Sequence, residues 1–281
     1  MSKDIALVTD STADLPLDFI KENKIEVIPL RVVFPDGEYR DGVDITPDEF
    51  YEKLKKSNEL PKSSQPSPDD FVGVYQKLLQ EYKEVISIHL SSKVSGTINA
   101  AQLAKKKVGG TIHIFDSLTV SLGIGMQIRE ALNCIQEGWS GDKVIDYLHW
   151  MRDNSATYFT VDSLKYLYLG GRISKAKSLM GSILNIKPIL RLGPEGVEAA
   201  GKARSEPQLI NGVIRKFKEV AGDRAPGGMA VAQGAAKEMG YKMKEGLEKS
   251  FNIKTSFFGQ IGPTLGVHSG PGVVGVYMYF K

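Results

Sequence analysis

The chain has 281 residues, of which 42% are hydrophobic and 25% are charged. These fractions are ordinary for a globular protein and exclude a largely disordered chain. A single hydrophobic core rarely grows past about 250–300 residues, so we expect two domains. A formal net charge of +3, spread over interspersed charges, excludes a dedicated nucleic-acid binder.

The rest of the composition bears on the cellular compartment. The one cysteine, Cys134, excludes an intramolecular disulfide and a zinc site made of thiolates, and its apolar neighbours predict a buried core position. The first residues lack the charged-then-apolar pattern of a secretion signal, and no apolar run approaches the ~20 residues of a membrane span. We therefore expect a cytoplasmic protein with no integral membrane association.

Strand-like and helix-like segments alternate through the first half of the chain. An apolar run at 5–9 predicts a buried strand that opens into the polar segment 10–12. Thr46, ahead of a proline, and the proline-rich acidic segment 66–70 predict two helix starts. The alternation favours a parallel sheet with helices on both faces, and hence a three-layer α/β domain over residues 1–156. Further strands are predicted at 25–33, 85–90 and 111–115, and further helices at 95–105, 122–136 and 141–151.

The second half predicts an α+β domain over residues 157–281 that packs on the first. The pair Gly170-Gly171 marks a turn, and the apolar segment 179–190 leads into short strands. Helices are predicted at 164–168, 206–220 and 237–251, and strands at 189–192, 197–200, 228–233 and 273–280.

Small polar residues follow three of the predicted strands, at 10–12, 91–97 and 116–117. Ligands of open parallel sheets bind at the carboxyl ends of the strands, although each of these groups alone is also what a helix N-cap or a turn requires. At 95–97 a hydroxyl-rich loop leads into a helix, whose first N–H groups and dipole favour a carboxylate or a single phosphate. The G-x-G-x-x-G spacing of a dinucleotide site is absent, and we expect no cofactor and no metal.

Three further positions carry candidate functional side chains. His268 lies in the glycine-rich segment 266–272, which we predict to be a mobile loop, and a functional role is expected there. Arg172 is either a capping cation at a helix end or a guanidinium that faces an acid. Ser63 and Ser64 belong either to a turn or to a site.

Seven short motifs follow one another along nearly the whole chain: Val8–Leu15, Ser63–Ser67, Leu90–Thr97, Asp116–Ser117, Tyr168–Ile173, Lys187–Leu190 and Gly266–Gly272. In this order they resemble the DegV family, whose characterised members are fatty-acid-binding proteins that serve bacterial fatty acid kinase. The resemblance implies a non-catalytic protein that binds a long-chain fatty acid between its two domains.

The resemblance also implies which residues bind the ligand. The hydroxyls of Ser63 and Ser95 would hold the lipid carboxylate, His268 would complete the polar network, and Arg172 would lie close to it. The family often has threonine where Ser63 stands, and serine keeps the hydroxyl while losing the methyl group that restricts the rotamer. Polar neighbours expected in the same site are Ser64, Ser92, Gly96 and Thr97.

The energetics of a fatty acid require an apolar channel behind the polar mouth. A desolvated carboxylate has to be paired, whereas the acyl methylenes gain free energy by burial. The channel is expected to be lined by residues whose alternative place is the ordinary core: Ile124, Met126, Met180, Ile183, Leu184 and Ile186.

The implied partner is a dihydroxyacetone-kinase-like fatty acid kinase, which would supply ATP, magnesium and catalysis. The resemblance places its docking contact at Arg204, in a segment less basic than in many relatives. One alternative is a serine-dependent acyl hydrolase or transferase that uses Ser95 and His268, although the G-x-S-x-G motif is absent. Another is a sensor whose bound lipid only regulates.

Overall fold

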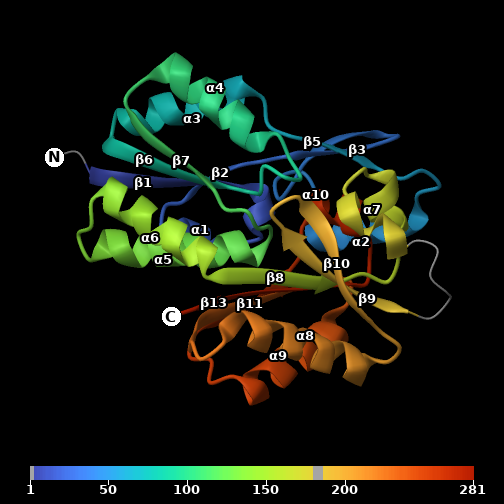
Figure 1. The fold of residues 1–281 in the computed structure, drawn as a ribbon. Coiled ribbons are helices and arrows are strands. Elements are labelled where there is room, and N and C mark those ends of the chain that lie inside the picture. The colour runs from blue at the N-terminus through green and yellow to red at the C-terminus, as the bar shows by residue number, and fades with distance from the viewer. Residues whose placement is uncertain (1–2, 180–185) are drawn as a thin grey trace.

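The structure is a computed structural model that describes residues 3–179 and 186–281. It is built on two main sheets with helices on both faces of the first (Figure 1). The first sheet has the strand order β2-β1-β6-β7, and its neighbouring strands are all parallel, which confirms the predicted parallel sheet. Its strands are β1 (Lys3–Asp10), β2 (Glu26–Ile28), β6 (Tyr82–His89) and β7 (Thr111–Asp116).

Two pairs of helices cover the faces of this sheet. Alternate residues of its strands point to opposite faces, so Ala6 packs in one apolar cluster and Leu7 in another. The first face carries α3 (Pro68–Leu79) and α4 (Thr97–Val108), and the second carries α5 (Leu122–Gln136) and α6 (Gly141–Asp153).

The predicted helix starts follow from local capping. Thr46 begins α2 (Pro47–Lys56) and Ser67 begins α3, each with a proline in the first turn. In both cases the hydroxyl accepts from the third helical N–H, and the acidic side chain at that third position accepts from the cap N–H.

The second sheet is larger and mixed, with the strand order β10-β9-β8-β13-β11-β12. Its strands β11 and β12 are parallel, and the other neighbouring pairs are antiparallel. Its outer face packs on α8 (Glu206–Ala221) and α9 (Lys237–Ser250). Its strands are β8 (Ser155–Thr160), β9 (Lys187–Gly193), β10 (Gly196–Ala203), β11 (Pro226–Gly234), β12 (Ser256–Gln260) and β13 (Val273–Phe280).

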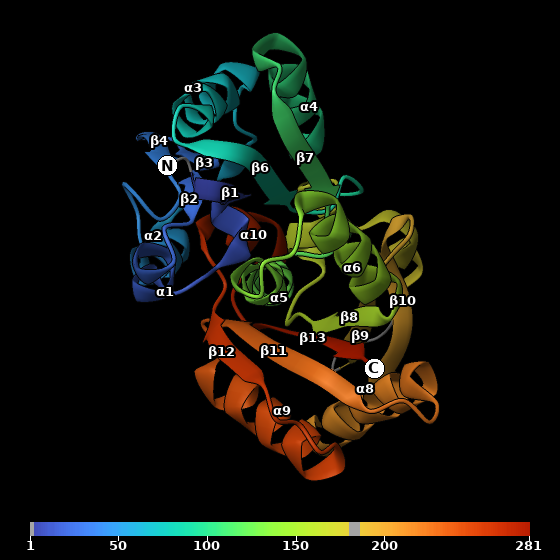
Figure 2. The ribbon, with the colours of Figure 1, turned by 90° about the vertical axis from the view of Figure 1, so that its left-hand side faces the viewer.

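The helices α5 and α6 lie between the two sheets, as the turned view in Figure 2 shows. One continuous apolar cluster joins Ile86 of β6, Ile128 of α5 and Tyr277 of β13. The two predicted domains therefore share a helical layer. The boundary predicted after residue 156 falls inside β8, and all of that strand belongs to the second sheet.

A small third sheet has the order β4-β3-β5. The strand predicted at 25–33 is in fact two: β2 pairs in the parallel sheet, and β3 pairs in this one. Its strands are β3 (Arg31–Phe34), β4 (Gly37–Arg40) and β5 (Lys62–Ser64), and α10 (Pro263–Ser269) packs against it. The remaining elements are η1 (Ser11–Ala13), α1 (Leu17–Glu22), α7 (Lys165–Leu169) and η2 (Ser174–Leu179).

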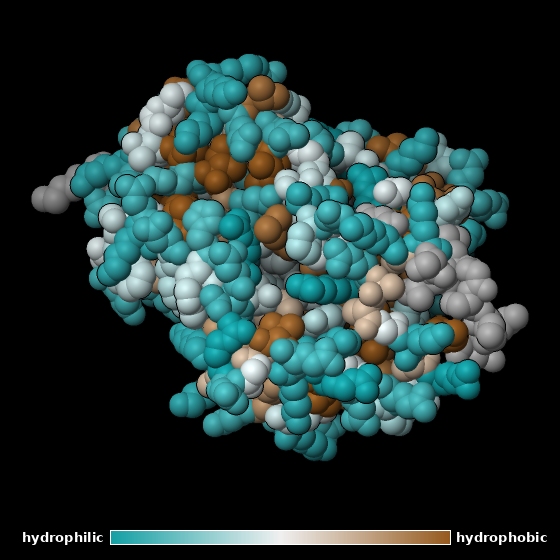
Figure 3. Space-filling model, viewed as in Figure 1, coloured by the Kyte–Doolittle hydropathy of each residue, from teal (hydrophilic) through white to brown (hydrophobic). Residues whose placement is uncertain are grey.

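The face of the molecule in Figure 3 is mostly hydrophilic, with apolar atoms gathered where α4 and β7 lie in Figure 1. Leu103 of α4 is 51% exposed, and β7 is an edge strand. Within the described ranges, no helix combines the length and the apolar character needed to cross a bilayer.

Candidate functional site

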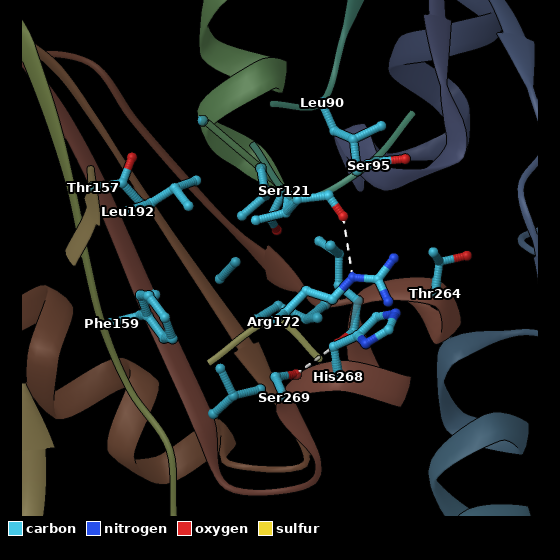
Figure 4. A pocket seen from close by; sticks show the side chains of 18 of the residues that line it. Leu90, Ser95, Ser121, Thr157, Phe159, Arg172, Leu192, Thr264, His268 and Ser269 are labelled. Atoms are coloured by element: carbon cyan, nitrogen blue, oxygen red, sulfur yellow. Dashed lines mark hydrogen bonds between the residues drawn. The ribbon is translucent and has the colours of Figure 1, made fainter. Parts of the chain in front are cut away.

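A pocket of about 350 Å³ lies between the inner face of the second sheet and the layer that contains α5. Such a volume lies at the lower end of the range for small-molecule sites. One end of the pocket is polar and partly exposed, with Ser63, Ser95 and Arg172 on its wall. The other end is buried and reaches Thr157 and Leu192, as Figure 4 shows.

Small side chains on the sheet explain why the pocket is hollow. In one row across the sheet, Tyr277 is opposite Ala230, and in the next row Gly275 is opposite both Phe159 and Ala232. A Cβ added at Gly275 would come no closer than 3.8 Å to its nearest neighbour, a Phe159 carbon. Space that larger strand residues would fill is therefore left open along the middle of the sheet.

At the polar end, Ser63 of β5 and His268 of α10 are joined directly. The distance from Ser63 Oγ to His268 Nε2 is 2.7 Å, across 205 positions of sequence. The prediction of a mobile loop over 266–272 is therefore wrong in part, because α10 extends to Ser269 and His268 lies on this helix. Glycine at 266 lets this helix pack closely, because a Cβ there would lie 2.4 Å from a Phe50 ring carbon.

The environment of His268 keeps its ring neutral. Burial, together with the smaller effect of the Arg172 charge, lowers the pKa of His268 from its usual value to about 4. Its Nδ1 has no hydrogen-bond partner among the described residues, and a Cβ at Gly170 would lie 2.3 Å from it. Since a buried N–H without an acceptor is costly, we assign the proton to Nε2, which then donates to Ser63 Oγ. The Ser63 hydroxyl is left to donate to a ligand.

Arg172 is fixed beside His268 by carbonyl oxygens. Its Nε donates to the carbonyl of Val94 at 3.1 Å, and its Nη1 donates to the carbonyl of Gly170 at 2.7 Å. Figure 4 shows the guanidinium next to the imidazole. These contacts hold the side chain while leaving its positive charge to act on a bound anion.

Ser95 stands at the start of α4. Its Oγ lies 2.9 Å from Thr97 Oγ1 and accepts from the N–H of Thr97 at 3.3 Å. Gly96 is the N-cap, and a Cβ there would lie 2.2 Å from Gln65 Oε1, so glycine lets the Gln65 side chain approach the helix start. The positive end of the α4 dipole therefore faces the same polar end of the pocket.

A family model described as an uncharacterised protein of the DegV family matches residues 4–281. The chain belongs to the DegV family. The matched solved structures include a Thermus thermophilus DegV family protein, described by its fatty acid binding, which is 35% identical with a TM-score of 0.94 and coverage of 100% of both chains. They also include Bacillus subtilis DegV, a fatty acid binding protein (35% identity, TM-score 0.89, 100% of both chains). A stearic-acid-binding protein from Eubacterium ventriosum is 27% identical, with a TM-score of 0.90 over 100% of this chain and 99% of that one.

The structure brings most of the residues implied by the DegV resemblance to one place. The pocket is lined by Ser63, Ser64, Ser95, Arg172 and His268. The other polar neighbours do not line it: Thr97 is buried behind Ser95, Gly96 packs on Gln65, and the exposed Ser92 donates its N–H to Asp116.

The predicted channel residues lie elsewhere. Ile124 and Met126 are fully buried in the core and do not line this pocket, and Met126 packs against Gly228 of β11. The pocket instead meets α5 at Leu122 and Gly123, because successive residues of a helix face different sides. Ile186 is partly buried and also does not line the pocket. The other three predicted residues, Met180, Ile183 and Leu184, lie outside the described residues.

Several pocket residues of this DegV protein were missed by sequence reasoning. They include Ser121 and Thr264 on the wall and the small residues of the sheet, Ala230, Ala232 and Gly275. The signal for the small residues is an alternation of small and branched side chains along one strand, as in 230–232, which marks a face with room beside it.

The geometry that a Ser95–His268 hydrolase needs is not made, because Ser95 Oγ bonds to Thr97 and His268 Nε2 bonds to Ser63. A serine–histidine–aspartate chain does exist elsewhere, in which His89 contacts Ser87 at 2.6 Å and Asp10 at 2.9 Å. All three residues are fully buried, so no substrate reaches them. Asp10 also accepts from the N–H of Leu90, which indicates a structural role for the first DegV motif.

Proposed function

We propose that this protein binds a long-chain fatty acid, with the carboxylate at Ser63, Ser95, His268 and Arg172 and the acyl chain in the pocket. The observation that carries the proposal is a pocket whose buried part is apolar and whose exposed end gathers neutral hydrogen-bond donors and a guanidinium. The fatty acid binding described for the Thermus thermophilus and Bacillus subtilis relatives supports it.

The free energy of such a complex comes mostly from the acyl chain. Burying about 16 methylenes at ~0.8 kcal/mol each contributes roughly 13 kcal/mol before opposing terms. The loss of translational and rotational freedom offsets a large part of this. The apolar wall, including Phe159, Leu192 and Val197, supplies the surface for that burial.

The headgroup contributes orientation. A carboxylate taken out of water has to be hydrogen-bonded, and the Ser63 hydroxyl, the Ser95 hydroxyl and the Arg172 guanidinium all face the polar end. Ser63 donates outward because His268 Nε2 occupies its acceptor side. A neutral imidazole suits this role, because it donates to Ser63 Oγ and leaves the Ser63 O–H free to donate to the carboxylate.

We also propose that the bound fatty acid is presented to a partner kinase of the dihydroxyacetone-kinase-like class, so that this protein is a non-catalytic accessory subunit. The carboxylate would lie at the exposed end of the pocket, where a second protein can reach it. Arg204, exposed beside the start of α8, is the proposed docking contact. Phospholipid metabolism would then receive the activated acyl group.

The binding proposal is tested by measuring stearic acid affinity by calorimetry. Ser63→Ala removes one charge-assisted hydrogen bond and should weaken binding about tenfold or more. Ser92→Ala is the matched control, because Ser92 is exposed and its hydroxyl does not line the pocket. A wild-type protein that binds no fatty acid, or equal affinities for both variants and the wild type, would remove the site from consideration.

The kinase proposal needs a separate assay. Arg204→Ala should leave stearic acid affinity unchanged and reduce the rate at which an added bacterial fatty acid kinase phosphorylates the bound ligand. Arg215→Ala is the control, because Arg215 is exposed on α8, whose start lies beside Arg204. Equal rates for the two variants would show that Arg204 is only a surface charge.

A further inference from the structure

The N-terminus of α10 is bound by two carboxylates from the first half of the chain. The N–H of Gly262 donates to Asp14 Oδ1 at 3.0 Å, and the N–H of Thr264 donates to Asp41 Oδ2 at 3.1 Å. Asp14 also accepts from the hydroxyl of Ser121, a residue of the pocket wall. Two acids therefore tie together the start of a helix and the pocket wall.

This helix carries the imidazole of the ligand site. His268 is the sixth of the seven residues of α10, and Thr264 and Leu265 of the same helix also line the pocket. A helix this short is not stable alone, so its position is set by the contacts that hold it. The place of His268 relative to Ser63 consequently depends on where the first turn of α10 is held.

The two acids lie close together, Asp41 buried and Asp14 partly buried. Asp41 is 4% exposed, and burial raises the pKa of both carboxyl groups, that of Asp14 well above its usual value. A Cβ at Gly262 would lie 2.7 Å from Asp14 Oδ1 and 3.3 Å from Asp41 Oδ1. Taking two neighbouring carboxyl groups partly or wholly out of water costs free energy that an apolar pair of the same volume would not. Their presence therefore indicates a geometric requirement at this helix end.

We propose that Asp14 and Asp41 are positioning residues of the ligand site, which bind the first turn of α10 and so hold His268 against Ser63. Neither residue lines the pocket, and both act through the helix. The inference rests on the proposed function, because the affinity that it concerns is that of the fatty acid site.

The backbone dictates the variants. Asp14 has φ 51°, in the left-handed region, where glycine and asparagine are tolerated and alanine is strained. Asp14→Gly and Asp41→Ala therefore delete the carboxylates, while Asp14→Asn and Asp41→Asn keep an oxygen that can accept from the helix N–H. Gly262→Ala is an independent variant that leaves both acids intact and inserts a methyl group between them.

Two measurements report on the inference, one without ligand. The ¹⁵N NMR shifts of the His268 ring follow its hydrogen bond to Ser63, and calorimetry gives the affinity for stearic acid. The deletion variants and Gly262→Ala should move the ring shifts towards those of a solvated histidine and weaken binding about tenfold, the loss expected for one hydrogen bond to a charged group. The asparagine variants should stay within about threefold of the wild type.

The control is Asp44→Ala. Asp44 lies three residues after Asp41, but its side chain is exposed and pairs with Arg40. Unchanged His268 shifts in folded deletion variants, or in Gly262→Ala where a deletion variant does not fold, would overturn the inference. Failure of the wild type to bind stearic acid would instead overturn the proposed function, and the ring shifts would still decide whether the acids position His268.

Discussion

A serine hydroxyl at the polar end of the pocket is directed outward by a neutral imidazole behind it. Sequence alone indicated that Ser63, Ser95, Arg172 and His268 belong together, because the resemblance supplied the association. Spacing could not supply it, since the Ser63–His268 contact spans 205 positions and depends on the packing of β5 against α10.

The lowered pKa of His268 predicts a pH-dependent stability. The ring stays neutral in the folded protein down to about pH 4, whereas in the unfolded chain it protonates near its ordinary value of 6.5. Between these values the unfolded state binds more protons, so the free energy of unfolding falls as the pH is lowered through this window and is full above it. The loss at pH 5 should be about 2 kcal/mol at most.

Urea unfolding at pH 7 and pH 5 checks this prediction. His268→Gln should lose less stability between the two pH values than the wild type does. His149→Gln is the control, since His149 is exposed on α6. If all three proteins lost the same amount, the His268 ring would have to be solvated in the folded state.

At the scale of elements, the strands and helices with strong periodicity were predictable, and the weakly encoded ones were not. The capping boxes of α2 and α3 predict where these two helices begin. In contrast, α10 contains Gly266 and follows Gly262, so its local propensity is poor, and it forms because distant partners bind its first turn. That dependence on tertiary contacts is why the sequence suggested a loop.

The split of 25–33 into β2 and β3 has a similar cause. A single apolar run gives no sign that its two halves pair in different sheets. Only Pro29 marks the turn between them. The prediction that Ile124 and Met126 line the channel is wrong for a related reason. An apolar side chain on α5 packs as well in the core as in a pocket wall.

The small residues of the second sheet predict how the pocket can be closed. Ala230→Leu should occupy the hollow, weaken stearic acid binding by about tenfold or more, and change the free energy of unfolding by no more than about 1 kcal/mol, because the new side chain enters empty space. Calorimetry and urea unfolding measure the two effects.

Ala199→Leu provides the comparison, since Ala199 is exposed on β10. It should leave both quantities unchanged. A large loss of stability in Ala230→Leu, with affinity kept, would indicate that this part of the sheet has no spare volume.

At the scale of the whole molecule, the two halves share α5 and α6 and one apolar cluster. Heat or urea should therefore unfold the chain in one cooperative transition. Far-UV circular dichroism and the fluorescence of Trp139, just before α6, and of Trp150, within α6, should give coincident curves. Stearic acid at 100 times its dissociation constant should stabilise the protein by about 2.7 kcal/mol by both probes.

Two separated transitions would contradict the shared core. They would assign the parallel sheet and the mixed sheet to independent folding units. The position of α5 between the sheets makes that outcome physically unfavourable, because either sheet unfolding alone would expose the apolar side of this helix.

The shared helical layer also limits how a ligand can enter the pocket. Because both sheets pack on the same helices, a hinge opening of the two halves would break the apolar cluster that joins them. A ligand would have to slide in lengthwise from the exposed end, methyl terminus leading. Its acidic group would then remain at the exposed end of the pocket, where another protein can contact it.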